Sequence, residues 1–146
     1  MAENIILSSL NNSMINIQKN EILNLNEKSQ EYGLILTPDD VENIVKSRNH
    51  TLNSYGRIDL NMDVTKEIME ILYKSQFTDK DDYVEMINDL VEIFYFLKNE
   101  TFDEISDKEI IEIIGEFYEE TRGRIDNIQD KAEKFSKDYK YNRGNI

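Results

Sequence analysis

The sequence contains no cysteine, and its 146 residues include a single histidine, His50, and a single proline, Pro38. The absence of cysteine excludes disulfide scaffolds and every metal or redox site that depends on a thiolate. One histidine excludes any catalytic or metal site that needs two of them within one chain. His50 has no serine nucleophile motif near it and is interpreted as a surface residue. No glycine-rich phosphate loop is present, since Gly123 and Gly144 are isolated.

Long apolar runs are also missing. No segment approaches the eighteen or so apolar residues that a membrane-spanning helix needs, and no basic and then apolar secretory signal opens the chain. We therefore expect a cytoplasmic protein without a membrane partner. Hydrophobic residues make up 39% of the sequence, which is enough to bury a core. A chain of this length is expected to form one domain over residues 1–146, with residues 141–146 as a flexible tail.

The charged residues are numerous and unevenly distributed. Thirty acidic residues against 17 basic ones give a formal net charge of −13. Residues 61–120 contain 18 acidic and 5 basic side chains, whereas residues 121–146 contain 4 acidic and 7 basic ones. Either the basic C-terminal segment lies across the acidic helices, or the acidic surface meets a basic partner. Binding to nucleic acid is disfavoured, because this net charge repels phosphate.

Apolar periodicity predicts an all-α protein, a compact bundle of five or six helices joined by short connections. A short element is expected before Asn11. The main helices are expected at about 15–32, 38–55, 64–76, 78–98, 107–117 and 125–139. The clearest helix start is at Thr37 and Pro38, an N-cap residue followed by a proline that fits the first helical position. Ser106 and Glu109 form a capping box before another helix.

One segment departs from helical spacing. Ile58, Leu60 and Met62 alternate with polar residues, which is the period of a half-buried strand. The only plausible pairing partner is the apolar segment 34–36. The sequence therefore leaves open a minor two-stranded ribbon formed by residues 34–36 and 57–62, which would need helices packed on it.

The segment 90–97 is apolar on every helical face except at Glu92. A helix that is apolar all round is usually covered all round. The segment is therefore predicted to form the core of the bundle, or to form the core and also a contact in a homodimer. The second alternative would explain why Phe94, Tyr95 and Phe96 point in three directions.

Two charged residues occupy positions where periodicity predicts burial. Arg48 shares a helical face with Ile44 and Leu52, and Glu92 interrupts the apolar segment 90–97. Burying either charge without a partner costs several kcal/mol. We expect Arg48 and Glu92 to pair with each other or with a neighbour such as Glu100. The pair is interpreted first as a structural contact, and alternatively as part of a ligand site.

Acidic pairs at i, i+3 suggest a different class of function. Glu67 and Glu70 on one predicted helix, with Asp89 and Glu92 on the next, could hold Mg²⁺ through carboxylate oxygens. The pattern resembles that of all-α nucleoside-triphosphate pyrophosphohydrolases, in which Glu-x-x-Glu is followed by Glu-x-x-Asp, although here the second pair has the reverse order. The resemblance implies a Mg²⁺-dependent enzyme whose four carboxylates converge. Such spacing is also common on solvated helix surfaces.

Two longer stretches are similar to an uncharacterised family. They are Asn26-Glu27-Lys28-Ser29-Gln30 with Tyr32-Gly33-Leu34, and Glu92-Ile93-Phe94-Tyr95-Phe96 with Lys98-Asn99-Glu100-Thr101. Together they resemble a domain of unknown function from low-GC Gram-positive bacteria, over about residues 10–128. The resemblance implies a single bacterial cytoplasmic domain. It implies no activity, because none is assigned to that family.

The sequence therefore favours a non-catalytic protein-binding or regulatory module without a cofactor. The expected partner is another protein or a second copy of the chain. The alternative is the Mg²⁺-dependent nucleotide hydrolase that uses Glu67, Glu70, Asp89 and Glu92. A third hypothesis is an acidic mimic of nucleic acid, which would need carboxylates spaced like phosphates along one exposed ridge.

Overall fold

The computed structural model describes the backbone of residues 2–144 and the side chains of residues 12–144. Over this range the protein is all-α, as predicted. The six long helices are α1 (Ala2–Leu23), α3 (Pro38–Ser54), α4 (Asp63–Lys74), α5 (Tyr83–Glu100), α6 (Asp107–Glu120) and α7 (Ile125–Gly144). The short elements are the four-residue α2 (Asn26–Ser29) and the 3₁₀ turns Gln30–Tyr32 and Lys80–Asp82.

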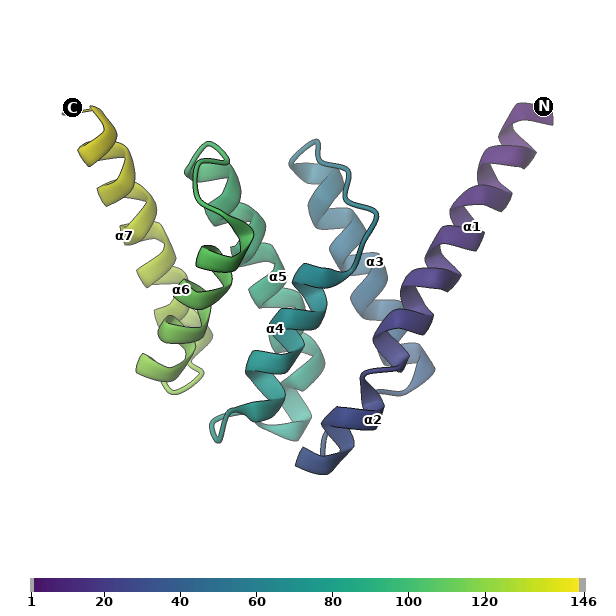
Figure 1. Ribbon diagram of the computed structural model, residues 1–146, viewed down its shortest axis with the longest axis horizontal. Helices are drawn as coiled ribbons and strands as arrows, with labels where there is room; N and C mark the ends of the chain where they lie inside the picture. Colours follow the sequence, from purple (N-terminus) through teal and green to yellow (C-terminus); the bar gives the residue numbers. More distant parts are fainter. Residues whose placement is uncertain (1, 145–146) are drawn as a thin grey trace.

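The long helices form two layers. In Figure 1, α1, α4 and α6 lie nearer the viewer, and α3 and α5 lie behind them. Helix α3 packs on α1 and α5, and α5 packs also on α4, α6 and α7. Helix α5 is therefore central, with α3, α4, α6 and α7 around it. The two ends of the chain lie at opposite ends of the molecule, because α1 and α7 are the outermost helices (Figure 1).

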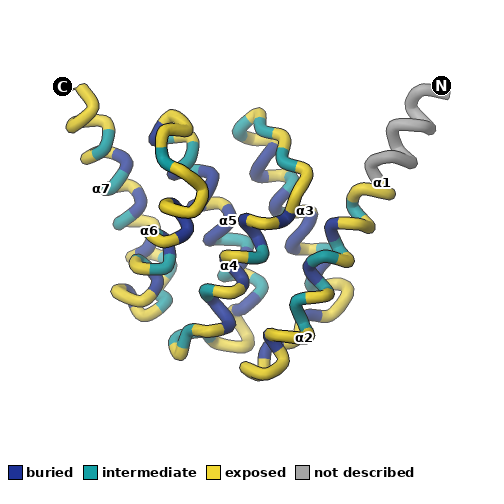
Figure 2. Tube along the Cα trace, viewed as in Figure 1, coloured by how far each residue is buried: buried dark blue, intermediate teal, exposed yellow. Residues whose placement is uncertain are grey.

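The core lies between the layers, where the buried positions of each helix face one another (Figure 2). The apolar segment of α5 is its centre. Leu90 and Leu97 are completely buried, and Phe94 contacts Tyr95 edge-on with ring centroids 5.0 Å apart. The prediction that this segment forms the core is confirmed. The burial of Phe94 and Tyr95 is explained within one chain, so these rings are not evidence for a homodimer.

Local capping determines where several helices begin. The Thr37 hydroxyl accepts a hydrogen bond from the backbone N–H of Asp40 at 3.1 Å, and the Asp40 carboxylate accepts one from the N–H of Thr37 at 3.0 Å. The Ser106 hydroxyl accepts a hydrogen bond from the Glu109 N–H at 3.2 Å, which is the first half of the predicted capping box; the described residues show no return bond from the Glu109 side chain. Thr78 does not begin a helix as predicted, because its hydroxyl donates to the Leu72 carbonyl oxygen at 2.5 Å.

The predicted ribbon is wrong. Neither 34–36 nor 57–62 is a strand, and the two segments do not pair. The backbone hydrogen-bonding groups of the two segments bind side chains instead. The Asn26 amide exchanges two hydrogen bonds with the backbone of Leu36, at 2.8 and 2.9 Å, and Arg48 binds the carbonyls of the second segment.

Both ends of the chain differ from the predicted boundaries. Helix α1 runs without a break through Asn11, whereas a separate short element was expected before that residue. At the other end, residues 141–144 are helical in α7 rather than part of a tail, and residues 145–146 lie outside the described range. Among the described residues, no helix combines the length and the apolar character required to span a membrane.

Helix α7 lies against acidic side chains of the rest of the protein. Within the described residues, its basic side chains form three ion pairs with residues outside α7, which are Lys131 with Glu120, Lys140 with Glu100 and Arg143 with Glu104. Arg143 also stacks on the Phe102 ring, 4.3 Å from its centroid. The interpretation that the basic C-terminal segment covers the acidic helices is confirmed. Each exposed pair stabilises the fold by about 1 kcal/mol or less.

Candidate functional site

Arg48 is buried, as its helical position predicted, with only 2% of its surface exposed. Its guanidinium donates from Nη2 to the carbonyl oxygens of Asp59 at 2.6 Å and Asn61 at 2.7 Å. Nη1 donates to the side-chain oxygen of Asn49 at 2.8 Å. The Asp59 carboxylate lies 3.9 Å from Nη2 and provides the compensating charge. A planar guanidinium with five N–H donors can bind several oxygens in this way.

The predicted partners of Arg48 are wrong. Glu92 is exposed on α5, and Glu100 pairs with Lys140. The segment that follows α3 supplies the oxygen atoms instead, because it folds back over the helix on which Arg48 lies. Helical periodicity could show that Arg48 is buried. It could not show that an irregular segment eleven to thirteen residues later would bind it.

Residues 58–60 of the segment 57–62 are turned over relative to the orientation that the alternation predicted. Met62 is buried, but Ile58 is 89% exposed and Leu60 is 63% exposed. Asp59, the polar residue between them, faces inward, and its carboxylate accepts a hydrogen bond from the Tyr95 hydroxyl at 3.1 Å. An unpaired buried guanidinium costs several kcal/mol. The requirement to bind Arg48 therefore outweighs the burial of two aliphatic side chains, each of which is worth about 2 kcal/mol.

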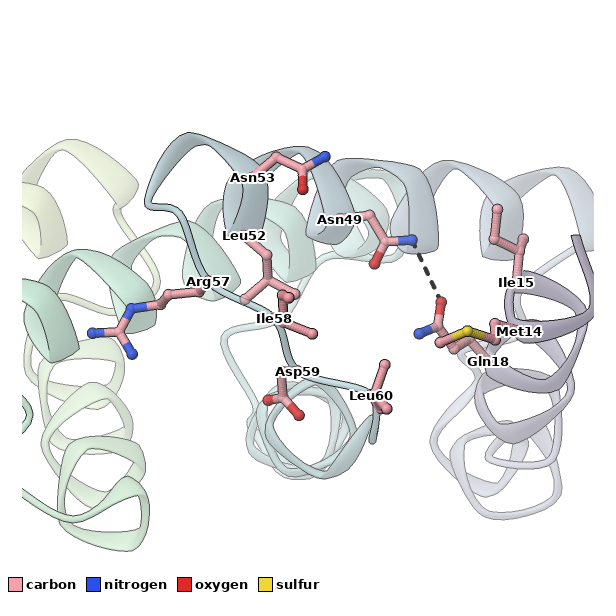
Figure 3. Close-up of a pocket in the computed structure, with 10 residues that line it drawn as sticks. All are labelled: Met14, Ile15, Gln18, Asn49, Leu52, Asn53, Arg57, Ile58, Asp59 and Leu60. Atoms are coloured by element: carbon pink, nitrogen blue, oxygen red, sulfur yellow. Dashed lines mark hydrogen bonds between the residues drawn. The ribbon is translucent and has the colours of Figure 1, made fainter. Parts of the chain in front are cut away.

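The exposed aliphatic side chains border a groove of about 350 Å³ between α1 and α3, which we call the α1–α3 groove. In Figure 3, Ile58 and Leu60 lie on one side of this groove, and Met14 and Gln18 of α1 lie on the other. The Gln18 side chain is buried and accepts a 3.4 Å hydrogen bond from the Asn49 amide, which links α1 to α3 across the groove. Met14 is 36% exposed.

The segment is attached at both ends. Before Ile58, the Arg57 backbone N–H donates to the Leu52 carbonyl at 2.8 Å, and the Arg57 guanidinium forms an ion pair with Asp103 at 2.8 Å. After Leu60, the Asn61 carbonyl binds Arg48. Figure 3 shows Arg57 extending away from the α1–α3 groove. The exposure of Ile58 and Leu60 is therefore a consequence of fixed contacts on either side of them.

The four carboxylates proposed to bind Mg²⁺ do not come together. Glu67 and Glu70 are exposed on α4, and Glu70 binds Lys74 at 2.6 Å. Asp89 and Glu92 lie on α5 and face a different cavity. Throughout the described part of the chain, no three histidine or carboxylate side chains are arranged to hold a metal ion. The predicted convergence is wrong, because α4 and α5 pack through their apolar faces. This packing leaves Glu67 and Glu70 on the exposed side of α4 and places Asp89 and Glu92 at a separate cavity.

Asp89 and Glu92 border a cavity of about 310 Å³, which we call the α5 pocket. It is lined by Tyr55, Asp89, Glu92, Ile93, Phe96, Gln129, Ala132 and Glu133, from the end of α3, from α5 and from α7. Partial burial, together with the charges of Glu85 and Glu92, raises the pKa of Asp89 to about 6. Burial and the Glu92 charge also raise the pKa of Tyr55. The pocket is therefore a negatively charged environment.

Sequence reasoning missed the α1–α3 groove. The alternation at 57–62 was visible, but it predicted that Ile58 and Leu60 were buried. The only signal for the correct orientation was the need of Arg48 for oxygen ligands, which the polar positions of the same segment could supply. His50 is exposed on α3, as predicted.

A family model described as a family of unknown function (DUF6323) matches residues 21–145 of the chain. The α1 side of the groove, Met14 to Gln18, lies outside the matched residues. No curated protein and no solved structure matches the chain.

Proposed function

We propose that this chain, which belongs to DUF6323, a family of unknown function, is a non-catalytic protein-binding module. The family agrees with the resemblance seen in the sequence. The support for the proposal comes from the surface of the protein. The partner binds at the α1–α3 groove. Ile58 and Leu60 are the side chains that it covers, together with Met14 on the opposite side.

The fixed exposure of Ile58 and Leu60 is the observation that supports this proposal. Single exposed aliphatic residues are common on protein surfaces and need no explanation. Here two of them project from a short segment whose backbone carbonyls at Asp59 and Asn61 accept hydrogen bonds from a buried arginine. They also border a concave surface of about 350 Å³ that a partner side chain can enter. A preorganised apolar site of this kind loses little conformational entropy when it binds.

The net charge favours a different protein over a second copy of this chain. Each copy carries a formal net charge of −13, so self-association brings two strongly negative molecules together. A partner with basic residues around an apolar anchor is attracted instead, which raises the rate of encounter. The homodimer is therefore the competing outcome in the experiment below.

The experiment compares the wild-type protein with the double variant Ile58→Ser/Leu60→Ser in affinity capture from a lysate of the source cells. Ile35→Ser is the matched control, because Ile35 is 64% exposed at a position outside the groove. We expect a captured protein to be retained by the control and lost by the double variant. Purified candidates are then titrated by calorimetry, in which loss of two apolar anchors weakens binding by about tenfold or more.

Two results would contradict the proposal. One is a purified partner that binds the double variant and the wild type equally. The other is a concentration-dependent homodimer, seen in analytical ultracentrifugation, that disappears in the double variant and persists in Ile35→Ser. The second result would assign the same surface to self-association.

A further inference from the structure

The α5 pocket contains three carboxylates without a cationic partner. Within residues 12–144, the side chains of Asp89, Glu92 and Glu133 take part in no ion pair and no hydrogen bond. Of the basic residues of α7, Lys131 binds Glu120, Lys134 binds Asp138 and Lys140 binds Glu100, while Lys137 is exposed and pairs with none of the pocket carboxylates within the described residues. The pocket therefore keeps an uncompensated negative charge.

Its more enclosed shape and its aromatic side chains distinguish this pocket from the acidic surface of α6. The acidic side of α6, with Glu112 and Glu116, borders only a shallow, open hollow. In the α5 pocket the carboxylates share a concave site with the rings of Tyr55 and Phe96 and with the aliphatic side chain of Ile93. Aromatic rings next to carboxylates are suited to an organic cation, because the ring faces attract the charge and the apolar atoms contact the alkyl stem.

We propose that the α5 pocket is a second binding site, which takes a lysine or arginine side chain of a partner protein. The carboxylates of Asp89 and Glu92 bind its cationic group, and Phe96 contacts its alkyl stem. Charge complementarity carries this assignment. The pocket offers three carboxylates to one cation, and the whole protein has an excess of negative charge that favours a basic partner.

The proposal is independent of the α1–α3 groove, because it depends on none of the residues that line it. A free polyamine has the same cationic chemistry as a basic side chain, so the experiment includes both. A metal ion is a poorer match, because carboxylate ligands of a hard cation need no aromatic or aliphatic lining.

The experiment is an NMR titration of the full chain with methyl labels on Ile93 and Ala132. The probes are arginine and lysine with blocked amino and carboxyl ends, the blocked form of citrulline, and spermidine. Citrulline has nearly the shape of arginine without its charge. We expect blocked arginine or lysine to shift both methyl signals saturably, while blocked citrulline binds at least about tenfold more weakly.

Variants test which residues bind the probe. Asp89→Asn/Glu92→Gln is expected to weaken binding about tenfold or more, and Phe96→Leu about threefold. Glu67→Gln/Glu70→Gln removes the same number of charges from α4 and is expected to leave binding nearly unchanged. All three variants are first checked for unchanged helical circular dichroism, and the α4 variant shows whether a loss of binding reflects net charge alone.

Three results would overturn the proposal. Equal binding of blocked citrulline would show that the charge of the ligand is irrelevant. An equal loss of binding in the α4 variant would show that the attraction is nonspecific. Saturation of the pocket by spermidine, with no shift from the blocked amino acids, would assign the pocket to a free polyamine instead of a partner protein. None of these results depends on whether Ile58 and Leu60 bind a protein.

Discussion

Replacement of Arg48 by methionine is the sharpest test of how the α1–α3 groove is built. Arg48→Met removes the hydrogen bonds from the guanidinium to the Asp59 carbonyl, the Asn61 carbonyl and the Asn49 side chain. Hydrogen bonds from a charged donor stabilise a fold by about 1.5–3 kcal/mol each. Two effects reduce this loss of stability. The side chain of Asp59 is 27% exposed and can be solvated. In addition, methionine fills an apolar site without the desolvation cost of a guanidinium.

The expected net loss in the free energy of unfolding is about 3 kcal/mol, which corresponds to a decrease of about 10 °C in Tm for a domain of this size. Urea denaturation followed by circular dichroism at 222 nm measures it. Lys46→Met is the control, because Lys46 lies two positions before Arg48 on the exposed face of α3 and, within the described residues, forms an ion pair only with Glu42. The control is expected to change the stability by less than about 0.5 kcal/mol.

A second measurement separates loss of stability from loss of the groove. Hydrogen exchange of the backbone amides in segment 57–62 should accelerate in Arg48→Met beyond the global change, because the guanidinium no longer fixes the carbonyls at 59 and 61. A change in unfolding free energy below 1 kcal/mol, with unchanged exchange in this segment, would refute the role assigned to Arg48.

Two further predictions concern single positions. The pKa of Asp89 is raised to about 6 in the folded protein, above its unfolded value, so its ionisation destabilises the fold as the pH rises from about 4 to 6. Asp89→Asn should therefore be more stable than the wild type by about 1 kcal/mol at pH 7, after allowance for solvent screening, and equal to it below pH 4, as measured by urea denaturation at the two pH values. Gly123→Ala should cost about 2 kcal/mol in thermal unfolding, because φ is +76° and the new Cβ would lie 3.1 Å from the Tyr118 ring. Gly33→Ala, with φ of +80° and open space around it, should cost only about 1 kcal/mol, and equal losses at the two glycines would refute the contact with Tyr118.

The helices and much of the core could be predicted from the sequence because their signals are local. The start of α3 at Thr37 and Pro38 depends on a capping box that spans four residues. The central position of α5 follows from the apolar segment 90–97, since such a helix must be covered on all sides. The ion pairs of α7 with the acidic helices follow from the opposite charges of the two regions. Each of these conclusions requires only short-range patterns or the overall distribution of charge.

The candidate sites depend on contacts that no local pattern contains. Alternation at 57–62 showed that Ile58 and Leu60 point away from Asp59, but not which of these side chains faces inward. The partner of Arg48 decided that question, because a buried charge takes whatever oxygen atoms the fold brings to it. The same holds for the acidic pairs. Their spacing placed Glu67 with Glu70 and Asp89 with Glu92, whereas helix packing placed the first pair on the outer side of α4 and the second in the α5 pocket.

The amino-acid sequence by itself thus determined an all-α domain with an acidic surface and a buried Arg48, because helix formation, helix capping and burial of apolar faces act over a few residues. The tertiary structure alone decided the ligands of that arginine, the outward orientation of Ile58 and Leu60, and the separation of the two acidic pairs. These features depend on residues that are distant in the chain and are brought together only when the two layers of helices pack.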